Sequence, residues 1–268
     1  MNCSANAKIN LGLRIVAKRP DGYHNIETVF YPIPLCDTLS VETGSCFRFT
    51  SDGLAVGGNP DDNLVCKAYR LLQSDFNLPP CHLHLHKVIP FGAGLGGGSS
   101  DAAFCIKLLN KWASLGLSLR QMEDYASRLG ADCAFFIQNR PMLARGIGNE
   151  FSATSLSLKG WHLVLVKPEV FVSTPEAYRG VTPVQPADRL EDWLQRPVEE
   201  WNEGVVNDFE ASVFPKYPIL PAIKQSLYDC GAAYTAMSGS GSTLFGLFRQ
   251  QPETKTLHTY GMVQRLML

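Results

Sequence analysis

Alternation of apolar and polar positions at the start of the chain predicts a long β-hairpin. Residues 8–16 alternate in this way, residues 26–31 are rich in β-branched and aromatic side chains, and the Pro-Asp-Gly sequence at 20–22 between them is typical of a tight turn. Residues 46–50 also have strand character, and the Asp-Gly pair at 52–53 after them predicts a second turn. The chain is therefore expected to open with sheet.

Helical spacing of apolar residues predicts helices in the middle of the chain. Asp62 is the expected N-cap of a helix whose apolar residues lie between positions 64 and 72. A second helix is predicted from about residue 99 to 112. Ser118 and Gln121 have the spacing of a capping box, which marks the start of a third helix.

Strand patterns return in the second half of the chain. Residues 161–166 and 244–248 are apolar and are predicted strands, while small and polar residues at 149–158 indicate a domain boundary. Two domains are therefore expected, residues 1–155 and residues 156–268. The pattern as a whole predicts the mixed α+β class.

Composition narrows the classes of function. Hydrophobic residues make up 45% of the chain, charged residues 18%, and the formal net charge is -1, which is typical of a globular protein and argues against nucleic acid or a membrane surface as a partner. Lys8 and Arg14 interrupt the apolar N-terminus, so no signal peptide is expected, and no apolar run approaches the length of a membrane span. The eight cysteines lack a CxxC pair and are expected to be thiols in the reducing cytoplasm.

The strongest chemical signal is a glycine-rich segment that leads directly into a predicted helix. Glycines at 94 and 96–98 allow the backbone to curl around an anion and point its N–H groups inward, while the helix adds the positive end of its dipole. The segment predicts a phosphate site, with a plain glycine-rich turn as the alternative. The predicted ATP contacts in it are Pro90, Gly92, Ala93, Gly94, Leu95, Gly96, Gly97, Gly98, Ser99 and Ser100.

Two familiar phosphate loops do not fit this segment. A dinucleotide-binding pattern begins at Gly92, but no acidic residue lies between Asp101 and Glu123 to hold a ribose. The Walker pattern fails because Gly98 stands where its lysine belongs. A kinase that uses this loop must bring its lysine from elsewhere in the chain.

Three segments in order resemble the superfamily of galactokinase, homoserine kinase, mevalonate kinase and phosphomevalonate kinase. They are Ala-Lys-Ile-Asn-Leu at 7–11, the loop at 90–100, and Ser-Gly-Ser-Gly-Ser at 238–242. The resemblance implies ATP and Mg²⁺ as cofactors, an N-terminal α/β domain like ribosomal protein S5, and a ferredoxin-like C-terminal domain. The 238–242 loop is expected to close over the site, with a strand-to-helix turn as the alternative.

Within that superfamily, three further segments are similar to the kinases of the non-mevalonate isoprenoid pathway that act on a cytidine-diphosphate derivative of methylerythritol. They are Arg-Pro-Asp-Gly-Tyr-His-Asn-Ile-Glu-Thr at 19–28, Gly-Ala-Asp-Cys-Ala-Phe-Phe at 130–136, and Asn-Asp-Phe-Glu at 207–210. Asn6 in place of Pro, and Asp101 in place of Asn, depart from the family pattern. We interpret both as changes of packing or backbone, so the resemblance still implies phosphorylation of the 2-hydroxyl of the methylerythritol.

Asp132 and Lys8 are the residues that the resemblance assigns to catalysis. Asp132 follows a helix-ending glycine and precedes an apolar run, which shields a carboxylate from water and favours a working base. Lys8 lies in an apolar strand, where a charge is costly without a partner. We expect Asp132 to take the hydroxyl proton and Lys8 to stabilise the alkoxide. The alternatives are a helix cap at Asp132 and an edge-strand lysine that reaches solvent.

Tyr23 and His24 directly follow the predicted turn, where recognition groups are often exposed. Tyr178 matches a second aromatic residue of the family, so a cytosine is expected to stack between Tyr23 and Tyr178, unless these are ordinary core or rim residues. Further predicted contacts are Asn10 and Thr174 for the small-molecule substrate, and Asn63 and Lys87 for ATP.

Two other functions fit parts of the pattern. A sibling kinase for mevalonate, homoserine or a sugar would share the glycine-rich loop, but its substrate has no base to stack on Tyr23. A non-catalytic nucleotide-binding protein of the same fold would be expected to lack Lys8 or Asp132. The sequence predicts neither the metal ligands nor the oligomeric state.

Overall fold

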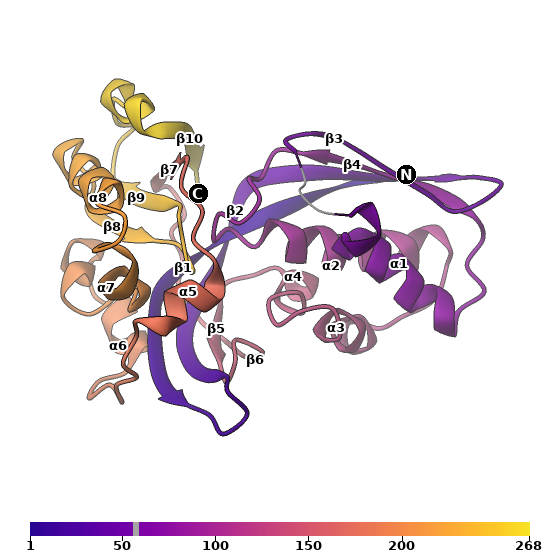
Figure 1. The fold of residues 1–268 in the computed structure, drawn as a ribbon, viewed down its shortest axis with the longest axis horizontal. Helices are drawn as coiled ribbons and strands as arrows, with labels where there is room; N and C mark the ends of the chain where they lie inside the picture. The colour runs from indigo at the N-terminus through magenta and orange to yellow at the C-terminus, as the bar shows by residue number, and fades with distance from the viewer. Residues whose placement is uncertain (56–58) are drawn as a thin grey trace. The chain divides into compact units, whose positions relative to one another are not determined.

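The computed structural model describes residues 1–55 and 59–268, which form two compact units (Figure 1). The first unit comprises residues 1–8, 35–91 and 96–140, and the second comprises residues 9–34, 92–95 and 141–268. Helices and strands occur in both, which confirms the α+β class. None of the helices in the described part of the chain has the length and apolarity that crossing a bilayer requires. The predicted division at residue 155 stays a prediction.

The N-terminal hairpin forms as predicted. Strand β1 (Asn2–Lys18) pairs with strand β2 (His24–Thr43). The turn between them is closed by the N–H of Arg19, which donates to the carbonyl of Tyr23 at 2.8 Å, and Asp21 accepts from the N–H of Tyr23 at 3.0 Å. Residues 7–15 are all buried, so the polar members of β1 are enclosed rather than exposed on one face.

The first unit packs helices against one face of a sheet (Figure 1). Strand β3 (Arg48–Gly53) runs parallel to β4 (Cys81–Lys87), and β4 runs antiparallel to residues 38–43 of β2. The helices are α1 (Leu64–Asp75), α2 (Gly97–Trp112), α3 (Leu119–Ser127) and α4 (Phe135–Gln138). Apolar side chains of α1, α2 and β4 form its core, among them Val65, Leu72, Leu83, Leu85, Ile106 and Leu109.

Of three local predictions in this unit, the capping box is confirmed, while the N-cap at Asp62 and the turn at residues 52–53 are wrong. The capping box of α3 is present, with the N–H of Ser118 donating to Gln121 Oε1 at 2.9 Å. The cap of α1 is Asn63, whose Oδ1 accepts from the N–H of Val65 at 2.9 Å, because Asp62 is the last residue of a 3-10 helix, η1 (Pro60–Asp62). The predicted turn at residues 52–53 is instead the end of β3, whose parallel partner β4 requires a longer connection than a tight turn.

The second unit contains a four-stranded antiparallel sheet in the order β10-β7-β9-β8. Its strands are β7 (His162–Pro168), β8 (Tyr234–Met237), β9 (Leu244–Phe248) and β10 (Gly261–Met267), which confirms the two predicted strands. Strands β5 (Met142–Arg145) and β6 (Glu150–Ala153) extend the N-terminal part of β2.

Helices of the second unit cover this sheet and the chain segments beside it. Helix α8 (Ile219–Asp229) contacts β8 and β9 and buries Leu220, Ile223 and Leu227 completely. The shorter elements are α5 (Thr174–Arg179), α6 (Leu190–Leu194), η2 (Val198–Glu203), α7 (Phe209–Val213) and η3 (Lys255–Tyr260).

Candidate active site

The glycine-rich loop leads from β4 into α2, as predicted. Gly96 is the N-cap of α2 with a φ of 69°, and no side chain caps the helix there. The first N–H groups of a helix have no partner within the helix, so this end offers donors and the positive end of a dipole to an anion. The loop therefore has the local geometry of a phosphate site.

Lys8 lies directly against this helix start. A Cβ on Gly96 would lie 3.1 Å from Lys8 Cε and 3.0 Å from the ring of Phe136, so the lysine passes where a larger residue would clash. Lys8 is 3% exposed, and its Nζ lies 3.6 Å from Asp132 Oδ2. Burial lowers the pKa of Lys8, and attraction to Asp132 opposes part of that shift. An ammonium group and a carboxylate therefore meet beside the loop.

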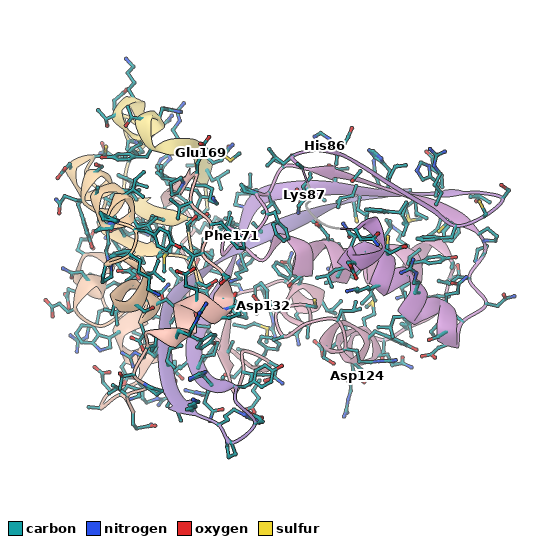
Figure 2. All side chains as sticks on the ribbon, in the orientation of Figure 1. His86, Lys87, Asp124, Asp132, Glu169 and Phe171 are labelled. Carbon is teal, nitrogen blue, oxygen red and sulfur yellow. The ribbon has the colours of Figure 1, made fainter. Side chains whose placement is uncertain are left out.

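Asp132 lies in the segment between α3 and α4 (Figure 2). Its side chain is 33% exposed, so a ligand can reach it. Helix α4 has Ala134 as its N-cap, so Asp132 does not cap that helix. Lys8 is buried, so it is not an edge-strand lysine that reaches solvent. Both structural alternatives raised by the sequence are wrong.

Lys87 belongs to a buried cluster of charges at the base of the loop. Its Nζ donates to Asp37 and, at 2.8 Å, to Asp101 Oδ2. Asp37 Oδ1 also accepts from the N–H groups of Val88 at 2.6 Å and Ile89 at 2.8 Å. The cluster thus ties the end of β4, the entry to the loop and helix α2 together.

Asp101 is a member of this cluster whose pKa is raised. Burial raises its pKa to about 7, Lys87 opposes the shift, and the nearby charge of Asp37 adds to it. Its Oδ1 is buried without a hydrogen-bond partner in the part of the chain that the structure describes. Asp37 was missed by sequence reasoning, although an acidic residue inside the apolar run of β2 was a signal that a partner exists.

The loop at 238–242 connects β8 to β9, so the alternative of a strand-to-helix turn is wrong. Within the second unit it lies against the first half of the glycine-rich loop. Ser238 Oγ donates to the carbonyl of Gly94 at 2.8 Å, and the N–H of Thr243 donates to the carbonyl of Ala93 at 3.3 Å. Gly94 has a φ of 74°, and a Cβ there would lie 1.9 Å from the carbonyl oxygen of Ser238. Glycine is therefore required at position 94.

The predicted cytidine contacts also lie in the second unit. Tyr23 is 62% exposed beside the hairpin turn, as expected for a recognition group. The ring of His24 stacks on that of Tyr178, with centroids 4.6 Å apart and planes 18° apart, and Phe209 contacts Tyr178 edge-on at 4.8 Å. Partial burial and Lys18 lower the pKa of His24. The ring that stacks on Tyr178 is thus His24 and not Tyr23, and a base between Tyr23 and Tyr178 stays a prediction.

Asn10 and Thr174 both contact the 238–242 loop. The backbone N–H of Asn10 donates to Ser238 Oγ at 3.3 Å, and its side chain donates to Thr28 at 3.1 Å. Thr174 Oγ1 lies 3.3 Å from Ser240 Oγ. Both candidates for substrate contact are thus attached to one loop.

Several predicted ATP contacts have side chains with partners inside the protein. Asn63 caps α1, Lys87 is paired with carboxylates, and Ser100 Oγ donates to the carbonyl of Asn6 at 2.7 Å. Their contact with ATP stays a prediction.

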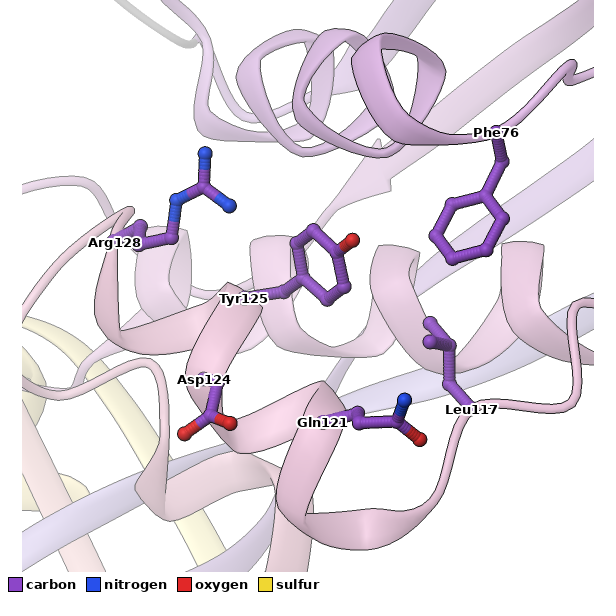
Figure 3. A pocket seen from close by; sticks show the side chains of 6 residues that line it. All are labelled: Phe76, Leu117, Gln121, Asp124, Tyr125 and Arg128. Atoms are coloured by element: carbon purple, nitrogen blue, oxygen red, sulfur yellow. The ribbon is translucent and has the colours of Figure 1, made fainter.

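A surface depression of the first unit lies apart from these residues (Figure 3). Figure 3 shows the ring of Tyr125 between Arg128 and Phe76, with Leu117 below Phe76. The remaining residues that line it are Gln121 and Asp124. No predicted site residue contributes to this depression, so it does not change the assignment of the active site.

Two family models match the chain and define its class. Residues 63–140 match the N terminal domain of the GHMP kinases, and residues 191–257 match the GHMP kinases C terminal model. The chain therefore has the two-domain α+β fold of an ATP-dependent GHMP kinase, as predicted.

Similarity to individual proteins narrows this class. The chain is 57% identical over 254 residues to the 4-diphosphocytidyl-2-C-methyl-D-erythritol kinase of Bacteroides fragilis, which covers 93% of this chain and 92% of that one. A crystal structure of 4-(cytidine 5'-diphospho)-2C-methyl-D-erythritol kinase superposes with a TM-score of 0.84 at 32% identity, covering 99% and 98% of the two chains. The mevalonate kinase of Methanococcus jannaschii shares the fold, with a TM-score of 0.75 at 13% identity, over 100% of this chain and 98% of that one. The chain belongs to the 4-diphosphocytidyl-2-C-methyl-D-erythritol kinase family.

The raised pKa of Asp101 predicts a pH-dependent stability that Asp101→Asn removes. Between the ordinary value of 3.8 and about 7, the native state keeps a proton that the unfolded state has lost. The free energy of unfolding therefore falls as pH rises through this window, by about 1.4 kcal/mol per pH unit for one proton. Asn does not titrate, so we expect the variant to gain stability relative to the wild type between pH 5 and pH 8.

Urea unfolding at several pH values between 5 and 8 measures this difference. Asp124→Asn, at an exposed position of α3, is the matched control and should follow the wild type at every pH. A constant difference between Asp101→Asn and the wild type across the range would show that Asp101 does not titrate there.

Proposed function

We propose that this protein transfers the γ-phosphate of ATP to the 2-hydroxyl of 4-diphosphocytidyl-2-C-methyl-D-erythritol, a step of non-mevalonate isoprenoid precursor biosynthesis. The observation that carries the proposal is the contact of Lys8 with Gly96, which brings a buried ammonium and the partly exposed Asp132 to an anion-binding helix start. The names of the related kinases supply the substrate.

The transfer itself requires positioning and charge stabilisation more than covalent chemistry. The substrate hydroxyl attacks the γ-phosphorus, the bond from that phosphorus to the β–γ bridging oxygen breaks, and ADP leaves. Asp132 accepts the hydroxyl proton. Lys8 stabilises negative charge on the attacking oxygen, and it acts strongly because it is buried away from water. The N–H groups at the start of α2 hold the phosphates.

Mg²⁺ fits this site as an ion that arrives with ATP. Among the residues that the structure describes, no group of three or more His, Cys, Asp or Glu is placed to hold a metal. Mg²⁺ commonly keeps several waters and binds through phosphates with one or two carboxylates, so such a group is not needed. We propose that Ser99, in the first turn of α2, would face the ion, which would neutralise charge on the phosphates when bound.

The cytosine is proposed to stack on Tyr178, with Tyr23 as the second ring. His24 stacks on one face of Tyr178 with a centroid separation of 4.6 Å, which is the spacing that a stacked base would also adopt. We propose that the base takes the place of His24 on this face and that His24 hydrogen-bonds to its edge. Asn10 and Thr174 are proposed to orient the rest of the substrate.

The protein is proposed to work in the reducing cytoplasm. All eight cysteines lie in the described ranges and are free thiols. Burial raises the pKa of Cys81 to about 11 and that of Cys133 to about 12, which keeps both thiols protonated and unreactive.

The first test is ADP release with Mg-ATP and a panel of four alcohols. The panel contains 4-diphosphocytidyl-2-C-methyl-D-erythritol, mevalonate, homoserine and galactose. We expect release with the cytidine compound alone, because the other three have no base to stack on Tyr178. Release with mevalonate, homoserine or galactose instead would support kinase activity but contradict the proposed cytidine site.

Asp132→Asn should reduce kcat by about 10² to 10⁴, the usual contribution of a general base. The amide keeps the size of the side chain but cannot accept the hydroxyl proton. Circular dichroism and ATP binding by calorimetry establish that the variant is folded, and Asp124→Asn serves again as the control. A kcat within threefold of the wild type would exclude Asp132 as the base.

Tyr178→Leu should raise KM for the cytidine substrate about tenfold and leave KM for ATP within twofold, since stacking on a base contributes about 1–3 kcal/mol. Tyr178→Phe retains the ring and should behave like the wild type. Tyr228→Leu, in α8, is the control for loss of an aromatic residue elsewhere in the same unit. Equal effects on both KM values would indicate general damage instead of a base contact.

A further inference from the structure

The Asn-Asp-Phe-Glu segment at 207–210 marks the family likeness, but no chemical role follows from its sequence. Asn207 is 4% exposed and directs both donors of its side-chain amide at the start of the 238–242 loop. Its Nδ2 donates to the carbonyl of Met237 at 2.6 Å and to that of Gly239 at 2.8 Å. Its Oδ1 accepts from the N–H of Phe209 at 3.0 Å, which fixes the amide in this orientation.

Glu210 reinforces the same point of the loop. Its Oε1 accepts from the N–H of Met237 at 2.8 Å, so the two side chains bind the N–H and the C=O of one residue. Its Oε2 is paired with Lys224 of α8 at 2.6 Å. The carboxylate is therefore anchored to a helix on one side and to the loop on the other.

Asp208 connects this segment to β1. Its N–H donates to the carbonyl of Leu13 at 2.8 Å, and its Oδ2 accepts from the N–H of Ile15 at 2.7 Å. Asn10, on the same strand, donates its backbone N–H to Ser238 Oγ. Residues 207–210 and the 238–242 loop are thus held against one strand.

The loop needs such support because it cannot hold its own shape. Residues 238–242 are Ser and Gly, which have no apolar side chain to pack, and glycine loses the most backbone entropy when it is ordered. Ser238 in turn donates to the carbonyl of Gly94. A shift of Ser238 is therefore expected to displace Gly94.

We propose that Asn207 and Glu210 are positioning residues, which hold the 238–242 loop where it fixes Gly94 for phosphoryl transfer. The effect on turnover rests on the proposed function, whereas the effect on the loop does not. Placement errors of about 1 Å cost around 10² in rate, so loss of this support is expected to lower kcat more than it weakens binding.

Asn207→Asp tests the first residue with almost no change in size. The aspartate keeps an acceptor for Phe209 but places a carboxylate oxygen against two carbonyl oxygens. Hydrogen exchange followed by mass spectrometry should show at least tenfold faster exchange in peptides that span 236–243. We expect kcat per folded enzyme to fall at least tenfold, with KM for both substrates changed less than threefold.

Glu210 provides the rescue comparison. Glu210→Gln keeps an acceptor for the N–H of Met237 and should exchange like the wild type, whereas Glu210→Ala loses the acceptor and should resemble Asn207→Asp. Lys224→Met removes the ion pair with Glu210 but leaves the acceptor, so it should lower stability without changing loop exchange or kcat. If Asn207→Asp does not fold, the comparison of Glu210→Gln with Glu210→Ala still tests the positioning role.

Unchanged exchange at 236–243 in both Asn207→Asp and Glu210→Ala would overturn the proposal. Faster exchange with an unchanged kcat would overturn the positioning role, since the loop would then move without consequence. A wild-type enzyme that releases no ADP with any alcohol of the panel contradicts the proposed function alone, and the exchange data then decide whether the two residues hold the loop.

Discussion

A loop built mainly from glycine cannot fix its own shape by packing, and the active site depends on how such a loop is held. Within the first unit, Lys87 binds Asp37 and Asp101 and so joins the strand before the loop to the helix after it. Within the second unit, Ser238 binds the carbonyl of Gly94. Both supports are polar side chains that lie beside the loop.

The two buried lysines of the first unit differ in how their charge is compensated. Lys87 is enclosed by Asp37 and Asp101, which are themselves buried, so its charge is engaged in holding the structure. Lys8 faces Asp132, whose side chain is 33% exposed, at 3.6 Å, which is longer than a strong charge-assisted hydrogen bond. This difference in partners is consistent with the proposed roles, in which Lys8 acts in catalysis and Lys87 holds the structure.

Much of the fold was predictable because its signals are local. The Pro-Asp-Gly turn of the first hairpin and the Ser118–Gln121 capping box act over a few residues, and both are confirmed. The Asp-Gly pair at 52–53 failed because parallel pairing of β3 with β4 is set by contacts with a distant segment. The partners of Lys8 and Lys87 also lie far away in sequence, so spacing alone does not identify them. Only the resemblance to a family predicted that Lys8 and Asp132 are neighbours. Asp37 was not predicted, because no family motif includes it.

From the sequence, Asp101, which replaces the Asn of the family pattern, is interpreted as a change of packing or backbone. In the structure, this residue also alters the charge beneath the proposed phosphate site. A Cβ on Gly97 would lie 3.1 Å from Lys87 Nζ, so the charge cluster sits directly under the first residue of α2. With Asp101 protonated, one ammonium and one carboxylate balance; with Asp101 ionised, the cluster carries a net negative charge. An asparagine at this position cannot ionise and would leave the charges of Lys87 and Asp37 to balance one another. The aspartate instead makes the charge beneath the proposed phosphate site depend on a proton, because its pKa is raised to about 7.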